Sequence, residues 1–340
     1  MTTPPLLKHI PSIPYSDPPS RLQTLDVWLP RPIEQSDPNT TYWIIYIHGG
    51  AWRDPAQTSL TVLPTLSHLF GNTSTYAPVH PHIAGIASLN YRLSAYETHP
   101  TDPSRPDDAE RNASHPQHVR DCVRALRYLR KRYGVKRWIG VGHSCGATLL
   151  AQMVAGIGLE VGAPDSEEAG KSEEGEGDAG KENTRLTPAE GPTSLVLLAG
   201  IYSIPLLLST HSPPTCPPPI SAIYTSFIAH AFGPNTAAYL PASPISGTYT
   251  PSAWPSGRLV VLCHSYGDEL VERAQRDVMV VALDRAGWGV VVEEGDGEDE
   301  VGVGGRVVNV RDVKGGHDEV WEEGGQIARL LADVVGRLCA

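Results

Sequence analysis

The chain has 340 residues and a formal net charge of −11, and 40% of its residues are hydrophobic while 19% are charged. This length and hydrophobic content can bury a large core, which excludes a wholly disordered protein. The sequence has no apolar run of the roughly 18 residues that span a bilayer and no basic stripe that would bind nucleic acid. We therefore expect neither a membrane nor a nucleic acid as a partner.

The negative charge is concentrated in two tracts that are rich in glycine and acidic residues. Residues 160–191 contain almost no large apolar side chain, and residues 293–305 (EEGDGEDEVGVGG) have the same character. Neither tract can bury enough surface to offset the entropy lost on ordering. We expect a single domain over residues 1–340, interrupted by a disordered acidic insertion at 160–191 and by an acidic, glycine-rich loop at 293–305 that extends a hairpin or loop tip.

Short apolar or β-branched runs alternate with amphipathic segments along the chain. The predicted strands, in chain order, are 25–29, 42–47, 83–89, 137–141, 194–199, 258–263, 289–292 and 306–310. Apolar side chains recur at helical spacing in residues 119–133, 270–286 and 320–338. The proline-rich segments 213–219 and 241–255 favour irregular surface structure. The alternation predicts an α/β fold, a mostly parallel central sheet with helices on both faces.

The cysteines and the first residues bear on the cellular location. The five cysteines are widely spaced and form no CxxC motif, so we expect reduced thiols and neither a disulfide framework nor a thiolate zinc site. The first residues, MTTPPLLK, lack the basic segment and continuous apolar run of a secretory signal. Both observations favour a cytoplasmic location.

A GHSCG pentapeptide at residues 142–146 lies between the predicted strand 137–141 and a helical stretch. A serine on a tight strand-to-helix turn needs glycine two residues away on each side, because the strand and the helix approach too closely there for a β-carbon. The glycines centre the turn on Ser144, which is the candidate nucleophile. Cys145 is the other nucleophilic side chain here, but we expect its side chain to pack and its backbone amide to be free for the reaction.

A nucleophilic serine needs a base, and in this kind of turn an acid and then a histidine follow it along the chain. Asp268 comes shortly after the predicted strand 258–263, and His317 is the only histidine downstream of it. Taken alone, Asp268 also fits a helix N-cap and His317 a surface loop. Their order behind the serine turn favours the triad Ser144, Asp268 and His317.

A glycine pair follows the predicted strand 42–47, in the sequence HGGAW that comprises His48, Gly49, Gly50, Ala51 and Trp52. Taken alone, such a turn can simply end a strand. Beside a nucleophile, however, glycine lets backbone N–H groups approach an oxyanion, and each donor lowers the barrier by on the order of 3 kcal/mol. We expect this turn to contribute to an oxyanion hole.

Together these motifs resemble the α/β-hydrolases of the esterase and lipase branch, and HGGAW resembles the HGGxW motif of the kynurenine formamidase (arylformamidase) family. The similarity extends over residues 44–321 outside the acidic tracts and includes SLNYRL (88–93) and LAGIY (198–202). One departure is Ser203, because the family tends to carry an acidic residue there. The resemblance implies an α/β-hydrolase fold, a nucleophile, acid and base at Ser144, Asp268 and His317, and an oxyanion hole made by the amides of Gly50, Ala51 and Cys145.

The resemblance also implies a reaction: hydrolysis of N-formyl-L-kynurenine to L-kynurenine and formate, a step of tryptophan catabolism in the kynurenine pathway that feeds NAD biosynthesis. Among five aromatic residues considered for the substrate wall, we expect Trp52 to contact substrate, because it lies beside the glycine turn. The alternatives are a broad-range carboxylesterase with the same triad and a non-catalytic binding protein of the same fold. The five aromatic residues are Trp52, Tyr202, Phe227, Trp254 and Trp321.

The sequence contains no HExxH motif and no glycine-rich nucleotide cradle, so we expect no metal and no cofactor. Histidines near one another, such as those at 80 and 82, lack a carboxylate or cysteine at ligand spacing. The expected partner is the small-molecule substrate, and a homodimer is an expectation only at the level of the family.

Overall fold

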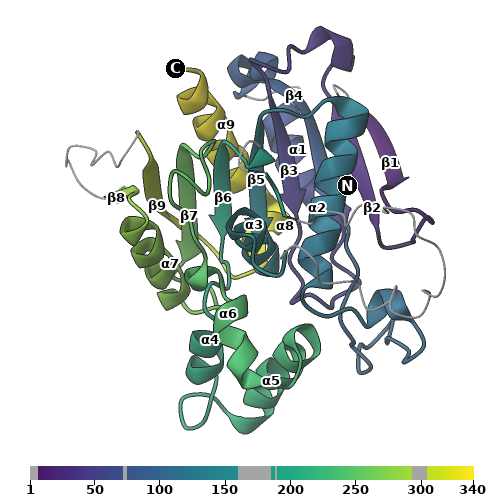
Figure 1. Cartoon of the computed structure of the whole chain (residues 1–340), viewed down its shortest axis with the longest axis vertical. Helices are drawn as coiled ribbons and strands as arrows, with labels where there is room; N and C mark the ends of the chain where they lie inside the picture. Colours follow the sequence, from purple (N-terminus) through teal and green to yellow (C-terminus); the bar gives the residue numbers. More distant parts are fainter. Residues whose placement is uncertain (1–6, 72–74, 160–184, 188–189, 293–304) are drawn as a thin grey trace, which may run out of the picture.

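A computed structural model describes residues 7–71, 75–159, 185–187, 190–292 and 305–340. A nine-stranded sheet runs through them (Figure 1), in which β1 pairs antiparallel with β2 and β2 antiparallel with β4, while the remaining neighbours are parallel. The strands, in order across the sheet, are β1 (Lys8–Pro14), β2 (Thr24–Leu29), β4 (Ile83–Leu89), β3 (Tyr42–Ile47), β5 (Trp138–His143), β6 (Ser194–Leu198), β7 (Leu259–Ser265), β9 (Val307–Val313) and β8 (Gly289–Val292).

Helices cover both faces of this sheet. Figure 1 shows α2 (Gln117–Tyr133), α3 (Cys145–Ala155) and α7 (Ala274–Arg285) in front of the strands and α9 (Gly325–Cys339) behind them. Successive side chains of β3 alternate between two buried clusters: Ile45 packs with α2 and α3, whereas Ile44 packs with α1 (Leu63–Phe70) and α9. A strand covered on both faces is apolar throughout, as the run YWIIYI is. The expected α/β fold is confirmed.

Two elements differ from the sequence prediction for local reasons. Strand β1 was not predicted, because two prolines interrupt its pattern. Proline is tolerated at the edge of a sheet, where β1 pairs with β2 alone. The expected helix 320–338 is divided into α8 (Glu319–Glu323) and α9 by Gly324, which has a φ of 71°. A β-carbon on Gly324 would lie 2.3 Å from the backbone nitrogen of Thr65, so only glycine fits this break.

The connection between β8 and β9 also differs from expectation. The two strands run parallel, with Val290 opposite Val308. Because a hairpin joins antiparallel strands, the hairpin alternative for residues 293–305 is wrong, whereas the loop alternative falls almost entirely outside the described residues. Most of both acidic tracts, 160–191 and 293–305, lies outside the described residues, so the expected insertions and the single domain remain predictions.

The segment after β6 lies beyond the carboxyl ends of the parallel strands (Figure 1) and contains α4 (Ile204–Thr210), α5 (Pro218–Phe232) and α6 (Tyr239–Ala242). The irregular surface structure expected for its proline-rich parts is wrong in two respects: one part is helical, and an irregular part is buried. Pro218 opens α5, where a missing N–H costs little. Trp254 is buried, and its indole N–H donates to the carbonyl of Pro192 at 2.7 Å. Ser203 caps α4 with its hydroxyl, a structural use for the position where the resembled family tends to carry an acid.

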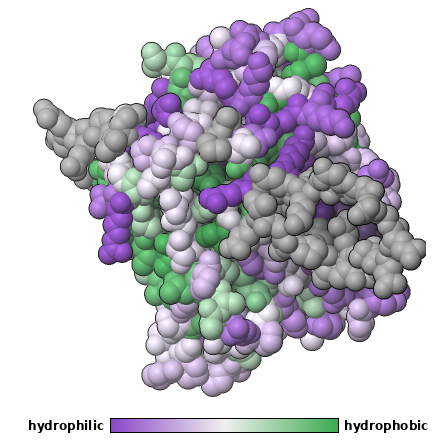
Figure 2. Space-filling view, in the orientation of Figure 1, coloured by the Kyte–Doolittle hydropathy of each residue, from purple (hydrophilic) through white to green (hydrophobic). Residues whose placement is uncertain are grey.

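Figure 2 shows hydrophobic side chains exposed over α7, where Val281 is 46% exposed. The same helix buries Met279 and Leu283 against the sheet. Among the described residues, none of the helices combines the length and the apolar character needed to cross a membrane.

Candidate active site

Ser144 lies at the turn between β5 and α3. Its backbone has a φ of 53° and a ψ of −125°, a conformation that residues other than glycine rarely adopt. A β-carbon on Gly142 would lie 2.6 Å from the Ala147 nitrogen, and one on Gly146 would lie 2.2 Å from the Ile47 carbonyl oxygen. Strand β5 and helix α3 therefore approach each other as closely as the two glycines of the GHSCG motif predicted. The tight turn between them holds Ser144 at the carboxyl edge of the sheet.

His317 and Asp268, which are far apart in sequence, meet beside this turn. The Nδ1 atom of His317 lies 2.9 and 3.0 Å from the two carboxylate oxygens of Asp268. Because an ionised carboxylate only accepts hydrogen bonds, Nδ1 carries the proton and Nε2 has a free lone pair. The amides of Leu270 and Val271 also donate to Asp268, at 3.0 and 2.9 Å, so the carboxylate is fixed from several sides.

The electrostatics keep Asp268 charged although its side chain is only 1% exposed. Burial acts to raise the pKa of Asp268, but the hydrogen bond and electrostatic attraction of the His317 imidazole, together with the hydrogen bond from the Val271 amide, outweigh it and hold the pKa below its usual value. A second histidine, His264, places Nε2 3.4 Å from the same carboxylate and 2.9 Å from the Val271 carbonyl. Burial lowers the pKa of His264. No sequence motif marks His264, so it was not among the predicted site residues.

Ser144 and His317 line one cavity of about 650 Å³, together with Gly50 and Ala51. The structure therefore brings Gly50, Ala51, Ser144 and His317 to one cavity from three distant segments, and Asp268 lies behind the His317 ring rather than in the cavity wall. Among the described residues no hydrogen bond joins Ser144 to His317. Such contacts are often long in a free enzyme and shorten when substrate binds.

The HGGAW turn lies directly against Ser144. A β-carbon on Gly49 would lie 3.1 Å from that of Ser144, and Gly50 and Ala51 have φ values of 93° and 49°. Among the described residues, neither the Gly50 amide nor the Ala51 amide donates to a backbone carbonyl. The hydroxyl of Tyr91 donates to the carbonyls of His48 and Gly49, at 3.1 and 3.2 Å, and so holds the turn.

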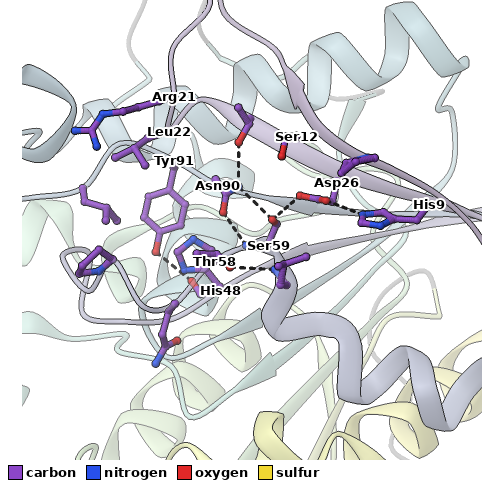
Figure 3. A pocket seen from close by; sticks show the side chains of 16 residues that line it. His9, Ser12, Arg21, Leu22, Asp26, His48, Thr58, Ser59, Asn90 and Tyr91 are labelled. Carbon is purple, nitrogen blue, oxygen red and sulfur yellow. Dashed lines mark hydrogen bonds and ion pairs between the residues drawn. The ribbon is translucent and has the colours of Figure 1, made fainter. Parts of the chain in front are cut away.

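Figure 3 shows a second cavity, of about 360 Å³, behind this turn, into which Tyr91 and His48 point. Its polar groups bond to one another: Asp26 accepts from the Ser59 hydroxyl at 2.6 Å and lies 2.7 Å from His9 Nε2. Burial lowers the pKa of His48 to about 4, so this imidazole is neutral. We interpret this polar cluster as support for the back of the turn.

The thiol of Cys145 joins the two motifs. Its sulfur accepts from the Trp52 amide at 3.2 Å and lies 3.5 Å from the Tyr91 hydroxyl. Burial raises the pKa of Cys145 to about 11, so the thiol is protonated and a poor nucleophile. The side chain packs, as expected, and the backbone amide begins α3 beside Ser144.

The structure corrects the expectation that Trp52 contacts substrate. Its side chain is fully buried and packs in the core against Phe227 and Phe232, with ring centroids 6.4 and 5.0 Å apart. Of the five aromatic residues considered, Phe227 lines the cavity, while Tyr202 and Trp254 are 1% exposed. The side chain of a residue beside a turn can point either way, and here the indole points inward.

Most of the cavity wall was not identified from the sequence. It includes apolar and aromatic residues of the segment after β6, for which no motif exists. Two further wall residues lie in or beside a named motif: Arg53 follows HGGAW directly, and Ile201 belongs to LAGIY. The missed wall residues include Arg53, Tyr96, Ile220, Ile223, Tyr224 and Leu270.

One group of described side chains has the composition of a metal site: His143, His317 and Asp318, whose ligand atoms lie within 4.8 Å of one another. Burial, and then the charge of His317, lowers the pKa of His143 to about 3, so its imidazole is neutral. A metal here would occupy the imidazole that Asp268 orients and so compete with its use as a base. The expectation that the reaction needs no metal remains a prediction.

Comparison with known proteins bears on both fold and family. No family model matches the chain. It is 34% identical to a kynurenine formamidase-like hydrolase of Fusarium equiseti, over 97% of this chain and 96% of that one, and 30% identical to a kynurenine formamidase of Aspergillus versicolor, over 83% and 84%. Among solved structures, esterase B of Lactobacillus rhamnosis covers 99% of this chain and 88% of its own, with a TM-score of 0.60 at 14% identity. A carbohydrate esterase from gut microbiota covers 97% and 96%, with a TM-score of 0.57 at 17% identity.

The sheet order, the serine turn and the similarity to esterase folds over nearly the whole chain make this protein an α/β-hydrolase. The full-length similarity to the fungal relatives identifies the branch. The chain belongs to the kynurenine formamidase family, as its HGGAW motif indicated. The relatives' names support a hydrolase that acts on a small molecule.

Proposed function

We propose that the protein hydrolyses N-formyl-L-kynurenine to L-kynurenine and formate by means of Ser144, His317 and Asp268. The observation that carries the proposal is the imidazole of His317, held by Asp268 at 2.9 Å in the cavity that Ser144 and the glycine turn also line. The names of the fungal relatives support the substrate. A cytoplasmic step of tryptophan catabolism that feeds NAD biosynthesis is part of the same proposal.

In the first half of the reaction, Oγ of Ser144 attacks the formyl carbon while Nε2 of His317 takes the hydroxyl proton. Asp268 keeps the imidazole in the required tautomer and stabilises the imidazolium. The carbonyl oxygen becomes an oxyanion that accepts hydrogen bonds from the backbone amides of Gly50, Ala51 and Cys145. His317 then protonates the nitrogen, the C–N bond breaks, and L-kynurenine leaves as the free aryl amine.

In the second half, water attacks the formyl ester on Ser144 and gives a proton to His317. The ester bond breaks, formate leaves, and the proton returns to the serine oxygen. A formyl group offers little surface for binding, so recognition falls on the aromatic ring and the amino-acid tail. The cavity of about 650 Å³ has the size of a site for a ligand of this kind.

A broad-range carboxylesterase using the same residues is the second candidate. The apolar wall residues Ile220, Ile223 and Leu270, each 42–52% exposed, favour it because they suit a hydrocarbon acyl or aryl group. Comparing kcat/KM for N-formyl-L-kynurenine with that for phenyl acetate decides between the two. A strong preference for the ester would overturn the formamidase assignment.

The direct test is turnover of N-formyl-L-kynurenine by the purified protein, followed by the absorbance of the product. We expect Ser144→Ala to reduce kcat by about 10³-fold or more, because the acyl-enzyme can no longer form. Ser209→Ala, at an exposed position on α4, is the matched control and should behave like the wild type. Near wild-type deformylation by Ser144→Ala would show that another group is the nucleophile.

A further inference from the structure

Arg53 is a buried cation on the wall of the catalytic cavity. It follows HGGAW directly and is 8% exposed. Its guanidinium carbon lies 4.0 Å from the centroid of the Tyr96 ring and 5.6 Å from that of Phe227. All three residues line the cavity that contains Ser144. These ring contacts position the guanidinium without using its N–H donors, which remain able to bind a ligand in the cavity.

The surroundings of Arg53 differ from those of the other buried arginines. Arg92 makes 2.9 Å hydrogen bonds to Asp121 through two of its nitrogens, and Arg276 bonds to Asp312 at 2.6 Å. Arg306 donates to the carbonyl of Tyr249. Among the described residues, by contrast, the guanidinium of Arg53 has no hydrogen bond and no ion pair. A guanidinium has five N–H donors, and none of the Arg53 nitrogens is among the fully buried, unpartnered atoms, so its donors are open to the cavity that the residue lines.

We propose that Arg53 binds a carboxylate of the substrate, so that the enzyme selects aryl formamides that carry an acid group. A guanidinium donates two parallel hydrogen bonds to a carboxylate, and such charged pairs are among the strongest in proteins. The inference rests on the proposed function and deepens it: the amino-acid tail of N-formyl-L-kynurenine ends in a carboxylate. Arg53 lies two residues after Ala51, so the tail would be held close to the oxyanion turn.

The same wall can receive the other charge of an amino-acid tail. Asp54, Glu269 and Asp318 line the cavity and carry carboxyl groups suited to an ammonium. A neutral ester would engage neither charge and would leave Arg53 without an acceptor. The competing interpretation is that Arg53 only packs between Tyr96 and Phe227 and so shapes the cavity. A shaping role affects charged and neutral substrates alike, whereas a binding role affects the charged substrate selectively.

The experiment compares two substrates in three variants. The substrates are N-formyl-L-kynurenine and 2-formamidoacetophenone, which keeps the ring, ketone and formamide but lacks the charged tail. For Arg53→Gln we expect kcat/KM on the charged substrate to fall at least about tenfold, mainly through KM, and the neutral substrate to be affected far less. Arg53→Lys keeps the charge and should restore part of the loss. Arg329→Gln, exposed on α9, is the matched control.

The outcomes separate this inference from the proposed function. An equal fall on both substrates, or no fall on the charged one, would overturn the carboxylate site while leaving the formamidase reaction intact. If the wild type fails to hydrolyse N-formyl-L-kynurenine, N-formylanthranilate and formanilide provide the same comparison, and loss of a preference for the acid in Arg53→Gln would still support the site. Inhibition of the wild type tests the site without any variant, so misfolding of a variant cannot affect the result. Benzoate-type acids should inhibit the wild type more strongly than the corresponding amides, and equal inhibition would contradict the inference.

Discussion

Replacing Asp268 with asparagine changes one atom of the buried pair with His317. The amides of Leu270 and Val271 now donate to Oδ1 of Asp268, and the Oδ1 of an asparagine can accept them equally well. The new NH₂ group, however, faces Nδ1 of His317 and makes this nitrogen an acceptor. The proton then moves to Nε2, which can no longer accept one from Ser144. Asp268→Asn therefore produces the wrong tautomer without opening a cavity.

The expected effect is large because the pair is buried. The side chains of Asp268 and His317 are 1% and 5% exposed, so no water replaces the lost charge beside the imidazolium. Loss of the orienting carboxylate in a serine triad of the chymotrypsin type lowers kcat by about 10⁴-fold, which corresponds to about 5 kcal/mol of transition-state stabilisation. The substrate wall is unaltered, so KM should change little.

The assay is steady-state hydrolysis of N-formyl-L-kynurenine, with thermal denaturation to verify folding. Asp284→Asn, at an exposed position on α7, is the matched control and should keep both the rate and the Tm. A fall in kcat of less than about tenfold in a folded Asp268→Asn protein would refute the reasoning. It would mean that His317 does not depend on Asp268 for its tautomer.

Three further predictions test the turn, its support and the buried histidines. Gly146→Ala should lower the Tm by several degrees, because its β-carbon would lie 2.2 Å from a carbonyl oxygen of β3. Gly336→Ala, which has open space around it in α9, should stabilise the protein by about 0.5–1 kcal/mol. Equal Tm values for the two variants would contradict this prediction. Tyr91→Phe should reduce kcat about tenfold with little change in KM, since it frees two carbonyls of the HGGAW turn; an unchanged kcat would count against that support. Burial lowers the pKa of His118 and of His143 to about 3, so below pH 6.5 the unfolded chain binds more protons than the folded one. The free energy of unfolding should therefore fall as the pH drops, by up to about 1.4 kcal/mol per pH unit for each histidine. Urea denaturation at pH 7 and pH 5 measures this, and equal midpoints would argue against buried neutral imidazoles.

Much of the fold was predictable because the parallel strands are covered on both faces and therefore read as continuous apolar runs. The run YWIIYI indicates a strand buried on both faces, and the helical spacing in 119–133 indicates a helix with one buried face. Strand β1 was not predictable in this way, because its pairing with β2 depends on tertiary contacts. The division between α8 and α9 depends on the approach of Gly324 to Thr65, which no local pattern encodes.

The candidate site likewise contains some residues that local sequence patterns identify and others that only tertiary packing determines. Ser144, His317 and the glycine turn have local signatures, because glycines are needed where backbones nearly touch. The cavity wall has none, since its residues come from α5 and from loops whose facing directions are set by packing. Trp52 illustrates the difference: its backbone position was identified correctly, but the direction of its side chain was not.

The sulfur of Cys145 has a consequence for how the family could change its substrates. The sulfur accepts a hydrogen bond from the Trp52 amide and so links the HGGAW turn to the residue after Ser144, and we expect the proposed oxyanion donors on both sides to move together. The wall contributed by α5 is not attached to these donors by this link. Substitutions there can remodel which molecule fits while the bond-breaking apparatus keeps its dimensions, which makes new specificities accessible without new chemistry.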